Sequence, residues 1–139
     1  EARALRSAVF RHPPGHMQRT AAYFLSLGHY DALVRRLRNA FHDRRRIMDK
    51  ALEANGLEVA GAGSFGGSSY WMRAPEGVDT EQLAEILRSK SVLIEPGPAF
   101  CEREDRHNRH FRLAYSSIST PQIAPGVALI AETIAEMQR

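Results

Sequence analysis

Residues 91–117 read SVLIEPGPAFCEREDRHNRHFRLAYSS, and this stretch decides the fold of the chain. Its short apolar runs predict one strand over residues 91–95 and a second strand over residues 109–115. Pro96-Gly97-Pro98 closes the first strand, and a polar loop over residues 102–108 precedes the second. The stretch therefore predicts two short strands joined by a turn and a loop.

The second strand carries a lone arginine, Arg112, among mostly apolar residues. Because side chains alternate between the two faces of a strand, Arg112 lies opposite the apolar face of Phe111, Leu113 and Tyr115. A guanidinium in this place needs a partner, and its planar fork of donors fits a carboxylate or a phosphate in a two-point contact. The partner is either such a ligand or an acidic neighbour in the same chain, and the strand alone leaves both alternatives open.

The order of these segments, followed by a capped helix, resembles the end of the small domain of fold type I pyridoxal phosphate aminotransferases. Two other segments extend the resemblance. Residues 11–31, RHPPGHMQRTAAYFLSLGHYD, together with RRLR at 35–38, are similar to the aminotransferase-like region of MocR-type regulators, a branch of the GntR transcription factors. Residues 66–73, GGSSYWMR, are similar to the glycine-led strand that opens the small domain. The segments cover nearly the whole chain in the expected order.

The resemblance implies an α/β fold, the small (C-terminal) domain of a fold type I aminotransferase, with a mixed sheet, flanking helices and a preceding helical arm. Residues 1–28 would be a helical segment from the end of the large domain, residues 29–56 a long connecting helix and residues 57–139 the small domain. Arg112 matches the family arginine that holds the α-carboxylate of the substrate. The implied partners are an amino-acid or amine effector and a second copy of the protein in a homodimer.

Periodicity and capping residues predict the remaining elements. We expect helices over residues 2–11, from His16 to Gly28 and from about Tyr30 to Asn55, with Gly28 as a left-handed cap. The other expected elements are strands over residues 57–60 and 69–73, a helix opened by Asp79 and Gln82, and a last helix capped by Thr120 with Pro121 in its first turn. The apolar stripes expected to be buried are Leu33, Val34, Leu37, Phe41, Met48 and Leu52 in the long helix and Ile123, Val127, Ile130, Ile134 and Met137 in the last.

Length and composition limit the function. A chain of 139 residues can bury a core but is shorter than a complete enzyme of this family, and its first residue is Glu1, so we expect a piece of a longer protein. A formal charge of +3 permits contact with nucleic acid without arguing for it. The single cysteine excludes an internal disulfide, and no apolar run reaches the length of a membrane span, so we expect a cytoplasmic protein.

The chain offers no complete catalytic centre. In the family, a lysine of the large domain forms a Schiff base with pyridoxal phosphate. Lys50 and Lys90 are the only lysines here, and both are expected to be solvated. The parent protein is thus implied to bind pyridoxal phosphate, whereas this chain alone should neither hold it stably nor catalyse transamination.

Other candidate sites have simpler interpretations. His107 and His110 lack the further ligands that a metal needs, and Cys101 is expected to be a small buried residue. Gly61, Gly63, Gly66 and Gly67 are expected to form tight turns rather than a phosphate-binding loop, and His12 replaces the asparagine of the family's AsnProPro loop. The basic cluster of Arg35, Arg36, Arg38, Arg44, Arg45 and Arg46 is expected to form a solvated, partly ion-paired helix face.

The sequence thus predicts the effector-sensing, aminotransferase-like part of a MocR/GntR-type regulator, with Arg112 as its carboxylate-binding residue. DNA would be contacted by a separate N-terminal winged helix, which nothing in this chain resembles. The alternatives are the small domain of a genuine pyridoxal phosphate aminotransferase and a free-standing binding module that uses the arginine-rich helix.

Overall fold

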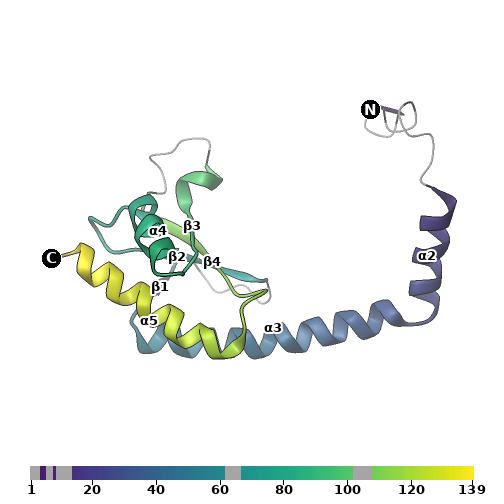
Figure 1. Ribbon diagram of the computed structural model, residues 1–139, viewed down its shortest axis with the longest axis horizontal. Helices are drawn as coiled ribbons and strands as arrows, with labels where there is room; N and C mark the ends of the chain where they lie inside the picture. The colour runs from purple at the N-terminus through teal and green to yellow at the C-terminus, as the bar shows by residue number, and fades with distance from the viewer. Residues whose placement is uncertain (1–3, 6–7, 9–13, 62–66, 102–107) are drawn as a thin grey trace. The chain divides into compact units, whose positions relative to one another are not determined.

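The computed structural model describes residues 4, 5, 8, 14–61, 67–101 and 108–139 (Figure 1). Their contacts divide the chain into two compact units, Glu1–Asn39 and Ala40–Arg139. Most of the helix expected over residues 2–11 lies outside the described residues, but Ala4, Leu5 and Ala8 are helical.

The first unit contains α2 (Gly15–Ser26) and the beginning of α3 (His29–Ala54). Gly28 lies between the two helices with a φ of 72°, in the left-handed region that glycine adopts without the steric penalty of other residues. Its N–H donates to the carbonyl of Leu25 at 3.1 Å. The predicted end of the second helix at Gly28 and the long third helix are therefore confirmed.

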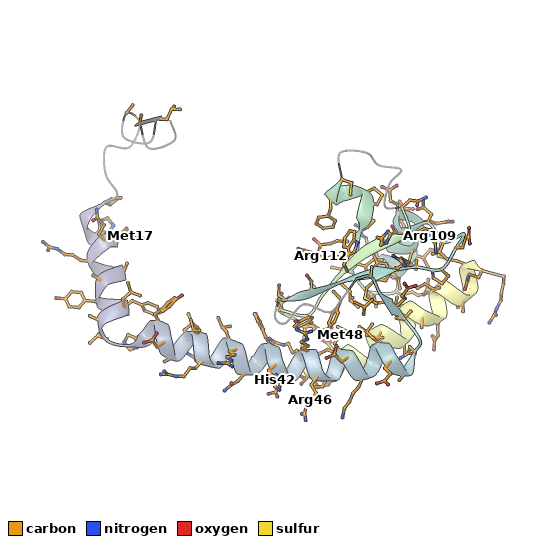
Figure 2. All side chains as sticks on the ribbon, turned by 180° about the vertical axis from the view of Figure 1, so that it is seen from behind. Met17, His42, Arg46, Met48, Arg109 and Arg112 are labelled. Atoms are coloured by element: carbon orange, nitrogen blue, oxygen red, sulfur yellow. The ribbon has the colours of Figure 1, made fainter. Side chains whose placement is uncertain are left out.

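The second unit begins within α3, where the apolar stripe of that helix becomes buried. Met48 and Leu52 are 2% and 3% exposed, whereas Val34 and Leu37 in the first unit are 43% and 44% exposed. Met48 points from α3 toward the sheet, and Arg46 lies on the opposite side of the helix (Figure 2). The stripe is thus confirmed as a core face in the C-terminal half of α3, whereas the predicted burial of Val34 and Leu37 is wrong.

Four strands form one sheet in the order β1-β2-β4-β3, and every described pair is antiparallel. The strands are β1 (Glu58–Val59), β2 (Ser69–Arg73), β3 (Glu95–Pro96) and β4 (His110–Ala114). The α/β class is confirmed, but the expected mixed sheet is corrected to an antiparallel one. β2 and β3 run in the same direction on either side of β4, so the parallel strands are not neighbours.

The strand expected over residues 91–95 is wrong in its extent, because only Glu95–Pro96 pairs with β4. The preceding residues instead close α4 (Thr80–Ser89). The N–H of Ser91 donates to the carbonyl of Arg88 and that of Val92 to the carbonyl of Leu87, at 3.1 and 2.9 Å. Ser91 also has a φ of 63°, which turns the chain out of an extended path.

The remaining elements follow the expected order. Asp79 caps α4 by accepting from the N–H groups of Glu81 and Gln82, at 2.9 and 3.0 Å. The 3-10 helix η1 (Gly97–Phe100) follows β3, and α5 (Thr120–Met137) ends the fold. The cap residue of α5 is Ser119 rather than the predicted Thr120, and its hydroxyl bonds to the Gln122 side chain instead of a backbone N–H.

The hydrophobic core lies on the face of the sheet that the sequence identified. Phe111, Leu113 and Tyr115 are at most 6% exposed, as are the expected α5 residues except the partly buried Met137. Residues of α3, α4 and α5 complete this core. Arg44 joins α3 to the loop before α5, donating to the carbonyls of Ile118 and Ser116 at 2.8 and 2.9 Å.

Two tyrosines on the core face have hydroxyls that are held by hydrogen bonds. The Tyr70 hydroxyl donates to Asp49 of α3, and the Tyr115 hydroxyl donates to the carbonyl of Gly67 at 2.8 Å. Burial, followed by the hydrogen bond to Asp49, raises the pKa of Tyr70 well above its ordinary value. Burial also raises the pKa of Tyr115.

We expect the free energy of unfolding to fall as the pH rises above about 10, the ordinary tyrosine pKa, because the unfolded tyrosines ionise there while the folded ones stay protonated. Below that pH the contribution is fully present. Tyr70→Phe should make the fall shallower, as measured by urea denaturation between about pH 8 and 11. Equal slopes for the wild type and Tyr70→Phe would contradict this assignment.

Candidate anion-binding site on the open face of the sheet

The face of the sheet opposite the core carries Arg112 and a row of aromatic and charged side chains. In the register of β2 and β4, Trp71 is paired with Arg112 and Arg73 with His110. Because side chains alternate between the two faces of a strand, these four lie on one face of the sheet. The residues that alternate with them, Tyr70, Met72, Phe111 and Leu113, face the core. The sheet therefore separates a polar, accessible face from its buried one.

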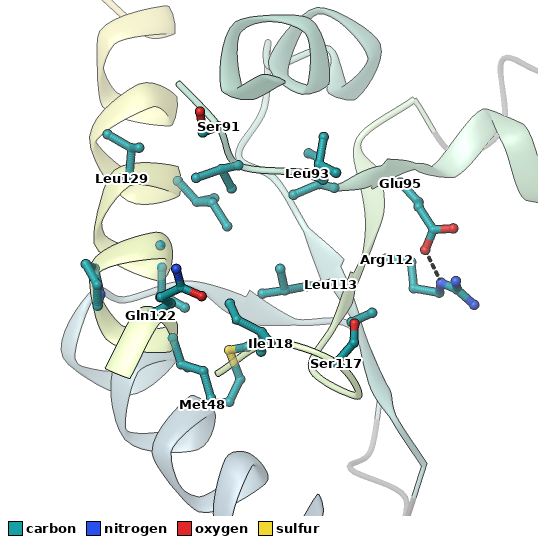
Figure 3. Close-up of a pocket in the computed structure, with 18 residues that line it drawn as sticks. Met48, Ser91, Leu93, Glu95, Arg112, Leu113, Ser117, Ile118, Gln122 and Leu129 are labelled. Carbon is teal, nitrogen blue, oxygen red and sulfur yellow. Dashed lines mark hydrogen bonds and ion pairs between the residues drawn. The ribbon is translucent and has the colours of Figure 1, made fainter. Parts of the chain in front are cut away.

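Arg112 has an acidic neighbour, one of the two alternatives that the sequence left open. Its Nε donates to Oε2 of Glu95, the residue paired with it across β3 and β4 (Figure 3). The two side chains are 42% and 47% exposed, so water screens the pair and its contribution to stability is small. Among the residues that the structure describes, no side chain or carbonyl accepts from the Nη1 and Nη2 groups of Arg112.

An aromatic ring supports the guanidinium of Arg112. Its Cζ atom lies 5.3 Å from the ring centroid of Phe100, at the end of η1, within the range of a cation–π contact. Phe100 meets Trp71 edge to face with ring centroids 5.7 Å apart, and Trp71 stacks on His110 at 5.8 Å. The row of rings thus extends from Arg112 across β2 and β4.

A second ion pair lies at the other end of the open face. Nη1 of Arg73 is 2.8 Å from Oε1 of Glu58 in β1, and Nε of Arg73 lies 3.4 Å from Nε2 of His110. Arg73 is therefore engaged within the sheet. Arg112 differs from it in having its Nη end open.

The sequence identified Arg112 and missed the residues around it. Glu95 was assigned only to the end of a strand, and Trp71 only to a glycine-led strand. Antiparallel pairing between consecutive strands joined by a turn was the signal that could have placed Glu95 beside Arg112. The contact with Trp71 depends on β4 inserting next to β2, which local sequence does not specify.

The two lysines lie apart from Arg112. Lys90 Nζ is 2.9 Å from Oε2 of Glu136 and 3.0 Å from the Thr133 hydroxyl, and its hydrogen bond lowers the pKa of Glu136. Lys50 is exposed on α3. The open face therefore presents the guanidinium of Arg112 but neither of the two lysines.

The arginine-rich part of α3 does not form one basic surface. Arg44 is engaged by carbonyls in the core unit, and the Cζ atom of Arg45 lies 5.8 Å from the ring centroid of Tyr70. Arg45 Nε is also 3.9 Å from a carboxylate oxygen of Asp49. The exposed members of the cluster are Arg35, Arg36, Arg38 and Arg46.

Other features add no chemistry to the site. In residues 14–61, 67–101 and 108–139 and the three described before them, no group of three metal-binding side chains occurs. Cys101 is half-buried. His12, Gly63, Gly66, His107 and most of the polar loop lie outside the described residues. No helix in the described part of the chain is both long enough and apolar enough to cross a membrane.

A cavity of about 720 Å³ lies on the core side of the sheet, between residues 91–94, β4 and α5 (Figure 3). Its walls include the apolar residues Met48, Ile118 and Leu129. The guanidinium of Arg112 points away from this space (Figure 3). Glu95 and Arg112 nevertheless belong to the lining of the cavity, so the cavity and the candidate anion site share these two residues.

Comparison with known proteins gives the family context. No protein-family model matches the chain. It is 57% identical over 95% of its length to the HTH-type transcriptional regulator TauR of Rhodobacter capsulatus, and 33% identical over 78% of its length to aromatic-amino-acid aminotransferase 1 of Thermococcus litoralis. The chain covers 27% and 26% of these proteins, so it spans about a quarter of the curated relatives it matches.

The solved structures most useful for comparison are aminotransferases. Kynurenine aminotransferase from Pyrococcus horikoshii superposes with a TM-score of 0.73 and 28% identity, over 84% of this chain and 29% of that one. A small sheet with flanking helices is the architecture of fold type I aminotransferase small domains, so the predicted α/β class is confirmed although the sheet is antiparallel rather than mixed. By sequence and by fold, the chain is therefore similar to the C-terminal aminotransferase-like domain of a MocR-type transcriptional regulator.

Proposed function

We propose that this chain supplies the carboxylate-binding residue, Arg112, of an effector-sensing aminotransferase-like domain. The observation that carries the proposal is the open Nη end of the half-exposed Arg112 guanidinium. Its Nε is already engaged by Glu95, and the plane of the guanidinium lies over the ring of Phe100. Two parallel N–H groups at that end match the two oxygens of a carboxylate. The effector would thus be an amino acid, held through its carboxylate against the open face.

The complete protein would add what this chain lacks. We propose that it binds pyridoxal phosphate through a lysine outside this chain, contacts DNA through a separate N-terminal winged helix and works as a cytoplasmic homodimer. In that arrangement, residues 1–28 belong to the end of the large domain, 29–56 form the connecting helix and 57–139 form the small domain. The effector would bind one arrangement of the dimer on DNA more tightly than another, and this difference in affinity would shift the dimer toward the first arrangement.

The part played by the residues of this chain is positioning. Arg112 would hold the carboxylate and thereby orient the rest of the effector, while Phe100 limits rotation of the guanidinium plane. The chemistry of the cofactor would be carried by residues elsewhere in the protein.

A comparison of ligands tests the proposal. In the full-length protein loaded with pyridoxal phosphate, each amino acid that binds is titrated by calorimetry beside the amine that lacks its carboxylate. We expect the amine to bind about 10- to 150-fold more weakly, the equivalent of losing a charged hydrogen-bond pair. Equal affinity of amino acid and amine would reject Arg112 as an effector-binding residue.

We expect the 139-residue chain on its own not to hold pyridoxal phosphate covalently, because Lys50 is solvated and Lys90 is engaged by Glu136. The chain is mixed with the cofactor, passed through a gel-filtration column and examined by visible absorbance. A stoichiometric band that persists, and that Lys50→Ala or Lys90→Ala abolishes, would contradict this expectation.

The alternative is the small domain of a genuine aminotransferase, which the similarity to the Thermococcus litoralis enzyme favours. The two functions differ in what the full-length protein does with the amino acid. A regulator changes its DNA binding when the amino acid is added, whereas an aminotransferase converts the amino acid to its 2-oxo acid with multiple turnovers.

A further inference from the structure

We infer that Glu95 is a positioning residue for Arg112. The Glu95 carboxylate holds the Nε side of the guanidinium, so that the Nη1/Nη2 end faces an anion with two oxygens. The inference rests on the proposed function of Arg112 as an anion-binding residue. It assigns to Glu95 the opposite role from a competitor, which would have to be displaced before an anion binds.

The backbone fixes both members of the pair. Glu95 and Arg112 are register partners in β3 and β4, so their Cα atoms are held by the same strand pairing. Glu95 is followed by Pro96 and by the buried Gly97, which begins η1. A carboxylate on a short, anchored strand end can restrain a long, flexible arginine side chain.

The contacts of Arg112 divide its guanidinium into engaged and open parts. Glu95 accepts from Nε, and Phe100 covers one face of the plane. A guanidinium can bind a carboxylate at either of two edges, and the contact to Nε leaves the end with Nη1 and Nη2 available. Figure 3 shows the guanidinium directed away from the middle of the cavity, although Arg112 belongs to its lining.

The location of Glu95 also limits the repulsion it exerts on a bound anion. Its side chain is 47% exposed, so water and salt screen its charge. Because the guanidinium is restrained before binding, the arginine side chain loses less conformational entropy when the anion binds. We therefore expect the restraint by Glu95 to outweigh the screened repulsion.

The test uses the 139-residue chain, with acetate as the carboxylate probe. Acetate replaces chloride at constant ionic strength, and the ¹H–¹⁵N signals of the arginine Nε–H groups are followed by NMR. The signal of Arg112 is assigned by its loss in Arg112→Ala. Glu95→Gln keeps an oxygen that can accept from Nε, whereas Glu95→Ala removes the acceptor.

We expect acetate to shift the Arg112 signal saturably, with a Kd within about twofold of wild type in Glu95→Gln and about tenfold weaker in Glu95→Ala. In the free protein, the Nε–H proton should exchange with water faster in Glu95→Ala than in the other two. Backbone amide spectra check that each variant is folded, and Glu95→Gln keeps the test valid if Glu95→Ala unfolds.

Each other result overturns a defined part of the account. Tighter acetate binding in both Glu95 variants would make Glu95 a competitor, and equal weakening in both would make its charge, rather than its position, the cause. An unchanged Kd in Glu95→Ala would leave Arg112 as the anion site and remove the role of Glu95. Absence of a saturable shift in the wild type would overturn the proposed function and this inference together.

Discussion

Replacing Phe111 by alanine is expected to lower the free energy of unfolding of the chain by about 3–5 kcal/mol. Phe111 is 1% exposed in β4, where it is paired with Met72 of β2 and with Pro96 of β3. Its removal combines the loss of buried apolar area with a cavity that surrounding strands cannot close without disturbing their pairing. A loss of this size is a large part of the stability of an ordinary domain.

Urea denaturation of the 139-residue chain measures this effect, with Leu93→Ala as the matched control. Leu93 lies just before β3 but is 75% exposed, so its truncation should change the unfolding free energy by only about 0.5 kcal/mol or less. Similar effects of the two substitutions would show that Phe111 is not part of a close-packed core.

Local patterns were sufficient to predict much of the fold. The alternation in residues 109–115 predicted β4 and its buried face, and the same rule predicted β2 with the bounds that the structure shows. Asp79 marked the beginning of α4, because a carboxylate at that position can accept from the first free N–H groups of a helix. These features depend on neighbours in sequence.

Features that depend on distant parts of the chain could not be predicted in the same way. Residues 91–94 have the composition of a strand, yet the N–H groups of Ser91 and Val92 donate to the last carbonyls of α4. Strand order decides that Trp71 and Phe100 lie beside Arg112, and apolar periodicity contains no information on strand order. The sequence therefore identified the arginine of the candidate site but not its surroundings.

Arg112→Ala in the full-length protein is expected to weaken binding of a carboxylate effector by about 2–5 kcal/mol, part of which is the cost of leaving the carboxylate without a partner. Arg112→Lys should also weaken binding, because an ammonium group cannot reproduce the planar two-point contact. Pyridoxal phosphate binding should change little, since neither lysine of this chain lies at the open face.

Calorimetry on the protein loaded with pyridoxal phosphate measures these affinities, and circular dichroism confirms that the variants are folded. The exposed Glu95–Arg112 pair contributes little to stability, so both variants should fold. Unchanged effector affinity in folded variants would leave Arg112 with only its ion pair to Glu95.

The most direct test of the account is a thermodynamic cycle between Arg112 and the effector carboxylate. Wild-type protein and Arg112→Ala are each titrated with an amino acid that binds and with the amine that lacks its carboxylate. If Arg112 holds that carboxylate, the two deletions are not additive, and the coupling energy is about 2 kcal/mol or more. The account would be contradicted if the two losses of binding free energy are additive, so that removing the carboxylate weakens binding to Arg112→Ala as much as binding to the wild type.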